Sequence, residues 1–201
     1  MIVLALLLAY CLGSIPTAVW VSKFFFGVDV RTLGSGNAGA TNVARTLGLR
    51  AALPVVLVDV GKGALAAAVP GLLWAQFPVW LPLACVGAAV LGHTFPVFAG
   101  FRGGKGVATA AGGLLLLAPS LVAVAALAWL AVAFTTRLVS LASLTAGVAL
   151  AVAALLWPSQ TPWGMKGVAL GLCLFVFWTH RQNIRRLLAG QEPRFSLAGK
   201  K

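Results

Sequence analysis

Residues 107–135 read VATAAGGLLLLAPSLVAVAALAWLAVAFT, and none of them is charged. An unbroken α-helix of this length would be about 43 Å long, whereas the hydrocarbon core of a bilayer is about 30 Å thick. The segment is therefore too long for one membrane span and too short for two. Pro119 lies near its middle, and proline interrupts helical hydrogen bonding and disfavours helical backbone in the residue before it. We expect a short half-helix before Pro119 and a full span after it.

The composition of the 201-residue chain is that of a helical membrane protein. Hydrophobic residues make up 61% of the chain and charged residues 9%, against about 25% charged in a soluble domain. The mean hydropathy is +1.00. These values exclude a disordered chain, a disulfide-rich secreted domain and a water-soluble enzyme. We expect an all-α, polytopic membrane protein that forms a single domain over residues 1–201, with further apolar runs at 2–22, 51–72, 79–92, 139–157 and 165–179.

The basic residues predict how these spans cross the membrane. The chain has 15 Lys and Arg residues and 3 acidic ones, and basic loops stay on the cytosolic side. With a break at Pro119 there are seven spans, and thirteen basic residues become cytosolic. Without the break there are six spans, and the basic residues of the loops and the tail divide equally between the two sides of the membrane. We expect seven transmembrane helices in the inner cell membrane, with the N-terminus outside and the C-terminus cytosolic. Anionic lipids or substrates are favoured as partners, and nucleic acid is not.

Polar and small residues within the spans have structural interpretations. Asp59 and Lys62 lie three residues apart in the second run, and we expect them to pair with each other inside the bundle. The three cysteines are isolated, so neither a disulfide framework nor a metal site is predicted. Close helix packing is the expected role of two glycine pairs, namely Gly61 with Gly63 and Gly167 with Gly171.

The first segment with polar chemistry is RTLGSGNAGATNVAR, residues 31–45. Ser35 or Asn37 could cap a short helix whose free N–H groups would face an anion. On that helix Asn37, Thr41 and Arg45 would lie along one face, because they are spaced four residues apart. This pattern favours a phosphate or polyol site. A glycine-rich loop at the membrane surface is the structural alternative.

The second segment is HTFPVFAGFRGGKGVAT, residues 93–109. Gly103, Gly104 and Gly106 would let a ligand approach the backbone, Lys105 adds a positive charge, and a helix follows directly. This is the design of a phosphate cradle. It is not a Walker A loop, because no Ser or Thr follows Lys105 directly. His93 is by default a surface histidine, and with no carboxylate in the next five residues the His-x4-Asp acyltransferase pair is missing.

Two later segments carry weaker signals. Arg137 precedes Ser140 and Ser143, which would share a helix face, although caps and surface arginines give the same pattern. His180 and Asn183 would share another face near the C-terminus. Lipid anchoring is the expected role of the neighbouring Arg185 and Arg186.

These segments together resemble a known family, the bacterial membrane glycerol-3-phosphate acyltransferases that use acyl phosphate as donor. The similarity covers nearly the whole chain in order. One departure is Gln182, where the family pattern has an acidic residue. The matching motifs are Gly13-Ser-Ile-Pro-Thr-Ala18, Gly34-Ser-Gly-Asn-Ala-Gly-Ala-Thr-Asn42 with Arg45, Gly92-His-Thr-Phe-Pro-Val-Phe98, Gly103-Gly-Lys-Gly-Val-Ala-Thr109, Thr136-Arg-Leu-Val-Ser-Leu-Ala-Ser143 and His180-Arg-Gln-Asn-Ile-Arg-Arg-Leu-Leu-Ala-Gly190.

The resemblance implies transfer of a fatty acyl group from acyl phosphate to the 1-hydroxyl of glycerol 3-phosphate, giving lysophosphatidic acid and phosphate at a cytosolic site. It implies no metal or cofactor. Membrane lipids and the soluble enzyme that makes acyl phosphate are the other expected partners. A transporter of organic phosphates is the alternative. The expected catalytic residues are Lys105, His93, Ser35 and Asn183, and the expected substrate-binding residues are Asn37, Thr41, Arg45, Gly103, Gly104, Gly106, Arg137, Ser143 and His180.

Overall fold

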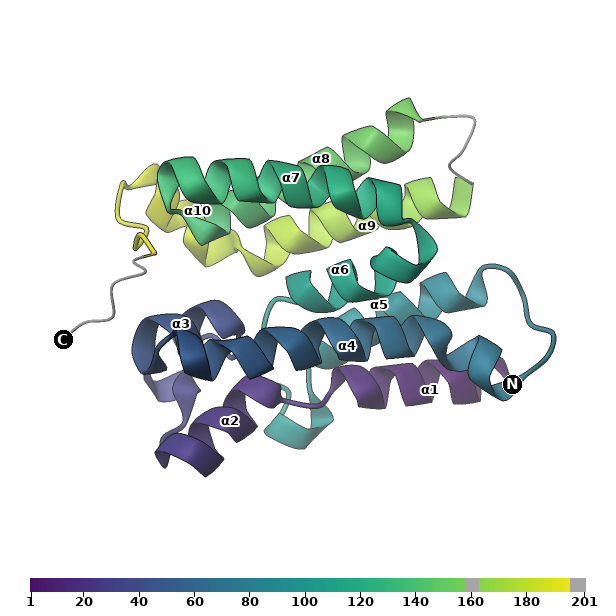
Figure 1. The fold of residues 1–201 in the computed structure, drawn as a ribbon, viewed down its shortest axis with the longest axis horizontal. Coiled ribbons are helices and arrows are strands. Elements are labelled where there is room, and N and C mark those ends of the chain that lie inside the picture. The colour runs from purple at the N-terminus through teal and green to yellow at the C-terminus, as the bar shows by residue number, and fades with distance from the viewer. Residues whose placement is uncertain (158–162, 196–201) are drawn as a thin grey trace. The chain divides into compact units, whose positions relative to one another are not determined.

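The computed structural model describes residues 1–157 and 163–195, and the regular structure in this part of the chain is entirely helical. The chain forms two compact units (Figure 1). The first covers Met1–Leu117, and the second begins at Ala118. The boundary falls where the sequence predicts a break, because α6 ends at Leu117 and α7 begins at Pro119. The predicted half-helix and full span are therefore separate helices.

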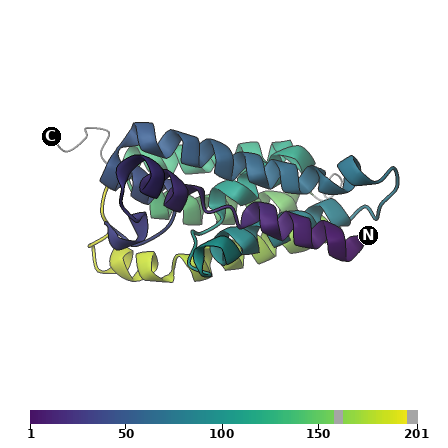
Figure 2. The ribbon, with the colours of Figure 1, turned by 90° about the horizontal axis from the view of Figure 1, so that it is seen from below.

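The first unit is a bundle of four long or apolar helices with two short helices at one end. α1 (Ile2–Gly13), α4 (Leu49–Leu73), α5 (Leu81–Thr94) and α6 (Val107–Leu117) lie side by side (Figures 1 and 2). α2 (Thr17–Phe26) and α3 (Ala40–Leu47) pack against the beginning of α4, with the 3-10 turns η1 (Val30–Thr32) and η2 (Val97–Ala99) in the connecting loops. Because α4 runs back along the span formed by α1 and α2, and α5 runs back along α4, residues 27–48 and 95–106 lie at the same end of this unit (Figure 1).

The first apolar run is broken into two helices, contrary to the expected single span. We expected one span over residues 2–22, but α1 ends at Gly13 and α2 begins at Thr17. Pro16 precedes α2 and cannot donate a backbone hydrogen bond, so the helical pattern is interrupted there. The break leaves the Ile15 carbonyl open to a side chain, and Lys62 Nζ donates to it at 2.9 Å.

Some of the predicted glycine contacts exist and others do not. A Cβ on Gly63 would collide with the Thr109 carbonyl of α6, so the two backbones touch there. Gly13 is held equally close to Ala89 of α5. The prediction was wrong for the other glycines, since a Cβ would meet no described atom within 4 Å at Gly61, Gly167 or Gly171.

The second unit consists of α7 (Pro119–Thr136), α8 (Val139–Leu156), α9 (Trp163–Thr179) and the short α10 (Arg181–Leu188). α8 packs against both α7 and α9. Five helical segments among the described residues are long and apolar enough to cross a membrane: Ile2–Phe26, Leu49–Leu73, Leu81–Ala99, Pro119–Thr136 and Val139–Leu156. Two shorter apolar helices, Val107–Leu117 and Gly164–Thr179, accompany them. At 11 residues α6 is about 16 Å long, about half the thickness of a bilayer core.

Candidate active site

The two polar segments of the first unit lie next to each other in space. Arg31 Nη1 donates a hydrogen bond to the Ala99 carbonyl at 2.8 Å. A Cβ on Gly104 would lie 2.8 Å from the Ala38 carbonyl. The loop before α3 and the glycine loop before α6 therefore form one polar end of this unit, as phosphate binding would require.

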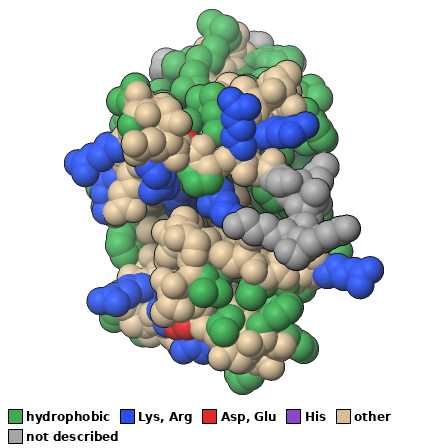
Figure 3. Space-filling view, turned by 90° about the vertical axis from the view of Figure 1, so that its left-hand side faces the viewer, with side chains coloured by type: hydrophobic (Ala, Val, Ile, Leu, Met, Phe, Trp, Pro, Cys, Tyr) green, Lys and Arg blue, Asp and Glu red, His purple; other side chains and the backbone are tan. Residues whose placement is uncertain are grey.

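Arg31 is fixed in place by Asp29. Its Nη2 lies 2.7 Å from Asp29 Oδ2, its Nε donates to Asp29 Oδ1 at 3.0 Å, and Lys23 Nζ is 3.3 Å from the same carboxylate. The hydrogen bond from Arg31 holds the pKa of Asp29 far below its usual value, and the same bond raises the pKa of Arg31. On the face drawn in Figure 3, Lys and Arg side chains outnumber acidic ones, which favours binding of an anion.

Asn42 shapes the loop that carries Ser35. Its side chain is 1% exposed, it donates to the carbonyls of Val30 and Leu33 at 3.0 Å each, and its Oδ1 accepts from the Ser35 N–H at 3.0 Å. Ser35 itself is exposed, between two glycines with positive φ. Asn42 was not among the predicted site residues, although it falls within the quoted motif.

The predicted helix cap was wrong. α3 begins at Ala40 after Gly39, with no side-chain cap, because Ser35 lies in a turn further upstream. Thr41 and Arg45 therefore share a face of α3, and Asn37 precedes the helix instead of continuing that face.

The glycine loop is built against His93. The N–H groups of Gly103 and Gly104 donate to the carbonyls of Thr94 and His93, each at 3.1 Å. A Cβ on Gly104 would collide with His93 Nε2, so the side-chain-free face of this glycine is filled by the imidazole. Gly106 has φ +77° and α6 begins directly after it, as predicted. Lys105 is half-buried and lies between Gly104 and Gly106.

His93 is buried and lies close to an acid, contrary to its default surface interpretation. Its side chain is 8% exposed, and its Nδ1 is 3.6 Å from Asp59 Oδ1. The same oxygen lies 2.8 Å from Lys62 Nζ and accepts from Thr17 Oγ1 at 3.3 Å. The predicted Asp59–Lys62 pair is confirmed. The histidine contact was missed, because Asp59 and His93 lie on different helices, α4 and α5.

The second unit places its predicted residues at the α7–α8 turn and around α10. Arg137 ends α7 with φ +61°, and its carbonyl accepts from the Phe195 N–H at 2.7 Å. Ser143 is buried, donates to the Val139 carbonyl and accepts from Trp129 Nε1 at 3.3 Å. These contacts bring the α7–α8 turn and the segment after α10 together.

Glu192 organises the histidine and asparagine segment. Asn183 Nδ2 donates to Glu192 Oε1 at 2.6 Å, and Arg186 Nε lies 2.7 Å from Oε2. Burial raises the pKa of Glu192, but the hydrogen bonds from Arg186 and Asn183 outweigh it and hold the pKa below its usual value. Arg186 is thus paired with an acid, although we expected it to anchor lipid. His180 is buried just before α10, with Nδ1 2.8 Å from the Val176 carbonyl.

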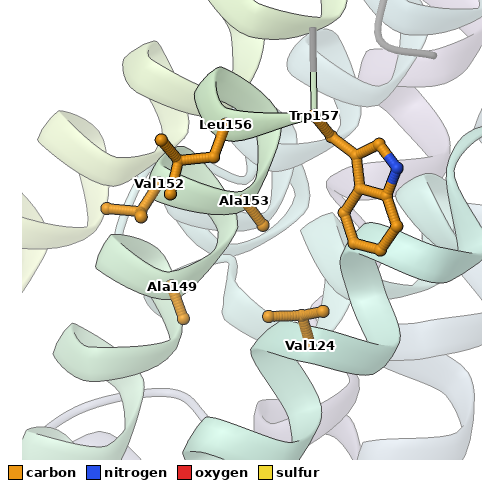
Figure 4. A pocket seen from close by; sticks show the side chains of 6 residues that line it. All are labelled: Val124, Ala149, Val152, Ala153, Leu156 and Trp157. Atoms are coloured by element: carbon orange, nitrogen blue, oxygen red, sulfur yellow. The ribbon is translucent and has the colours of Figure 1, made fainter. Parts of the chain in front are cut away.

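An apolar pocket of about 420 Å³ lies elsewhere in the second unit (Figure 4). It is near the beginning of α7 and the end of α8, away from the Arg137 turn. Its lining offers no catalytic group and consists of Val124, Ala149, Val152, Ala153, Leu156 and Trp157. Nowhere in residues 1–157 and 163–195 do three or more His, Cys, Asp or Glu side chains gather as metal ligands would.

Comparison with known proteins gives a consistent result across the chain. The family model described as glycerol-3-phosphate acyltransferase matches residues 3–190. A protein of that name from Enterococcus faecalis is 44% identical over 202 residues, which cover 97% of this chain and 92% of the relative. One from Synechococcus is 46% identical, covering 95% and 93%.

Two solved structures are similar as well. A crystal structure of PlsY (YgiH), described as an integral membrane glycerol 3-phosphate acyltransferase in its glycerol 3-phosphate form, superposes with a TM-score of 0.87. It is 39% identical, and the match covers 97% of this chain and 96% of the other. The lysophosphatidic acid form of that protein gives a TM-score of 0.84 at 38% identity, covering 98% and 96%.

Proposed function

Because the chain belongs to the glycerol-3-phosphate acyltransferase family, we propose that it transfers a fatty acyl group from acyl phosphate to the 1-hydroxyl of glycerol 3-phosphate. The products are lysophosphatidic acid and inorganic phosphate. The observation that carries this proposal is the glycine loop 103–106, which leads directly into α6 and lies against the Ala38 carbonyl of the other polar loop. Both substrates carry a phosphate, and the apolar helices suit the acyl chain.

The chemistry that such a site must supply is modest. An acyl phosphate is already activated, so the protein mainly positions the substrates and stabilises negative charge on the oxyanion and the departing phosphate. We assign this stabilisation to Lys105 and to the backbone at Gly106. The predicted donor role of the Gly103 and Gly104 backbone is not kept, because their N–H groups donate to the Thr94 and His93 carbonyls and shape the loop. The free N–H groups at the beginning of α6 contribute to it.

Residues of the first polar segment are assigned to glycerol 3-phosphate binding in the first unit, and residues around α10 are assigned to substrate binding in the second unit. Ser35, Asn37, Thr41 and Arg45 supply it in the first unit. Support in the second unit comes from the burial of Asn183, which is held by Glu192, and of His180, whose Nδ1 faces the Val176 carbonyl. Arg137 and Ser143 are assigned to substrate binding at the α7–α8 turn.

The donor preference is tested with purified protein in detergent. We expect lysophosphatidic acid to form from glycerol 3-phosphate and acyl phosphate, and not from acyl-CoA or acyl carrier protein. Lys105→Ala should abolish turnover, and Lys105→Arg should fail as well, because a planar guanidinium does not replace a compact ammonium. A transporter of organic phosphates would show no turnover without a sealed membrane. Near-normal turnover in folded Lys105→Ala protein would leave the loop with a purely architectural role.

The hydroxyl proton is assigned to the acceptor's own phosphate, whose second pKa is about 6. The rate should then rise with pH through about 6. Replacing glycerol 3-phosphate by its phosphonate analogue, whose second pKa is higher, should move this rise to higher pH. A rise that stays fixed with the analogue and disappears in His93→Gln or His180→Gln would assign the base to the protein.

We also propose seven spans with a cytosolic C-terminus, on the basis of the distribution of basic residues. Cysteines introduced near residues 40, 103 and 190 should all react with a membrane-impermeant thiol reagent only from the cytosolic side. Reaction at any one of them from the outside would contradict this topology.

A further inference from the structure

Asp59 makes more contacts than an ion pair requires. Lys62 Nζ already has two acceptors, namely Asp59 Oδ1 at 2.8 Å and the Ile15 carbonyl at 2.9 Å. The ion pair with Lys62 would by itself account for the presence of a buried carboxylate at position 59. Yet His93 Nδ1 also lies 3.6 Å from Asp59 Oδ1, in a region where all these side chains are less than one-tenth exposed.

This contact has a chemical consequence for the imidazole. A ring nitrogen that faces a carboxylate carries the proton, and the other nitrogen of a neutral ring is then an acceptor. In His93 the nitrogen that faces Asp59 is Nδ1, so in the neutral ring Nε2 is the unprotonated one. Nε2 is also the atom against which Gly104 is packed.

The glycine loop therefore rests on an imidazole whose orientation depends on Asp59. The Gly104 N–H donates to the His93 carbonyl, and the Cα of Gly104 lies against the ring, so the ring cannot turn without displacing the loop. Lys105 follows Gly104 directly. We infer that Asp59 is a positioning residue, which holds His93 with Nδ1 protonated and Nε2 toward the loop and so fixes the backbone that presents Lys105. The expected effect on turnover rests on the proposed function, whereas the protonation state of the ring does not.

The protonation state can be measured directly because the chain has only two histidines. Protein labelled with 15N-histidine in detergent gives separate nitrogen signals for protonated and unprotonated ring nitrogens, and His180→Gln assigns the remaining set to His93. For the neutral ring of His93 we expect a single tautomer, with the proton on Nδ1. A wild-type spectrum with the proton on Nε2 would overturn the inference.

The role of Asp59 is tested by removing the whole ion pair. Asp59→Leu combined with Lys62→Met leaves no unpaired buried charge, and such replacements are often neutral for stability. In this double variant we expect the preference for the Nδ1 proton to disappear. Turnover should fall about 10–100-fold, the loss expected when a catalytic group is displaced from its position. The matched control is Thr17→Val, which removes another partner of the same oxygen, at 3.3 Å. It should keep both the wild-type ring form and near wild-type turnover.

The outcomes separate this inference from the proposed function. An unchanged His93 signal in the double variant, or a changed signal with normal turnover, would refute the positioning role. Should the double variant not fold, the wild-type spectrum alone decides. A wild-type His93 with its proton on Nδ1 in a protein without acyltransferase activity would sustain the Asp59–His93 relationship and reject the proposed reaction.

Discussion

Asn183 is held by Glu192, whose Oε1 accepts a 2.6 Å hydrogen bond from Asn183 Nδ2 while Oε2 lies 2.7 Å from Arg186. We expect Glu192→Gln to lower the free energy of unfolding by about 1.5–3 kcal/mol, the range for a hydrogen bond to a charged group. It should also reduce turnover, because the glutamine NH2 group would face one of the two donors, Asn183 or Arg186, and the hold on Asn183 would weaken. Thermal unfolding in detergent and the acyltransferase assay measure the two effects. Arg185→Gln is the control, because it changes an exposed neighbouring arginine. Equal effects of the two variants would contradict this prediction.

Removing Asn42 should damage the loop that carries Ser35. Asn42→Ala leaves the Ser35 N–H without the acceptor that holds it and removes one of two hydrogen bonds from each of the Val30 and Leu33 carbonyls. An unsatisfied buried group costs about 1–3 kcal/mol, and each lost hydrogen bond adds about 0.5–1.5 kcal/mol. We expect a loss of stability of about 2–4 kcal/mol, measured by thermal unfolding. Asn42→Asp is the matched variant, since it keeps the acceptor for the Ser35 N–H and loses the two donated bonds. A neutral Asn42→Ala would show that the loop has another source of order.

The Asp29 carboxylate should make stability depend on pH in the acid range. Its pKa is lowered in the folded protein by the hydrogen bond from Arg31, whereas an unfolded chain has an Asp pKa of about 3.9. The carboxylate therefore stabilises the fold fully at neutral pH and loses this contribution as pH falls below about 4. At pH 7, Asp29→Asn should unfold at a lower temperature than wild type. The difference between the two unfolding temperatures should narrow as the pH falls below about 4. A difference that stays constant down to pH 2 would be inconsistent with a shifted Asp29.

Gly104 and Gly61 should respond oppositely to the same substitution. A Cβ at Gly104 would collide with His93 Nε2 and lie 2.8 Å from the Ala38 carbonyl, so Gly104→Ala should destabilise the protein and reduce turnover. Gly61 lies within α4 with open space around its Cα, so Gly61→Ala should be neutral or stabilise by up to about 1 kcal/mol. Thermal unfolding of both variants checks the prediction. Similar unfolding temperatures would show that the loop can move away from the histidine.

The helices could largely be predicted from sequence, because apolar runs and prolines act locally. Pro119 gave the boundary between α6 and α7 correctly. Pro16 gives a similar break, but the run around it is apolar on both sides and short enough for a single span, so length alone did not reveal it. Ser35 was misplaced as a cap because the glycines on either side of it permit a turn that composition does not distinguish from a helix start.

The candidate site could be predicted only as far as its motifs are contiguous. The glycine loop and the beginning of α6 follow from neighbouring residues. The contact between Asp59 and His93 joins residues 34 positions apart on two helices, and no pattern in either segment specifies the other. Glu192 was overlooked for the same reason, since its hydrogen bond to Asn183 depends on how the chain turns back after α10.

The interrupted first helix has a consequence for biogenesis. The Ile15 carbonyl accepts from the Thr17 N–H at 3.0 Å within the break, whereas its second donor, Lys62 Nζ, exists only after translation has passed residue 62. Broken helices are stable at membrane depth only where protein covers them. We therefore expect the break to be covered only once α4 has been made and has packed against it. A nascent chain that ends before Lys62 would leave the break without this cover.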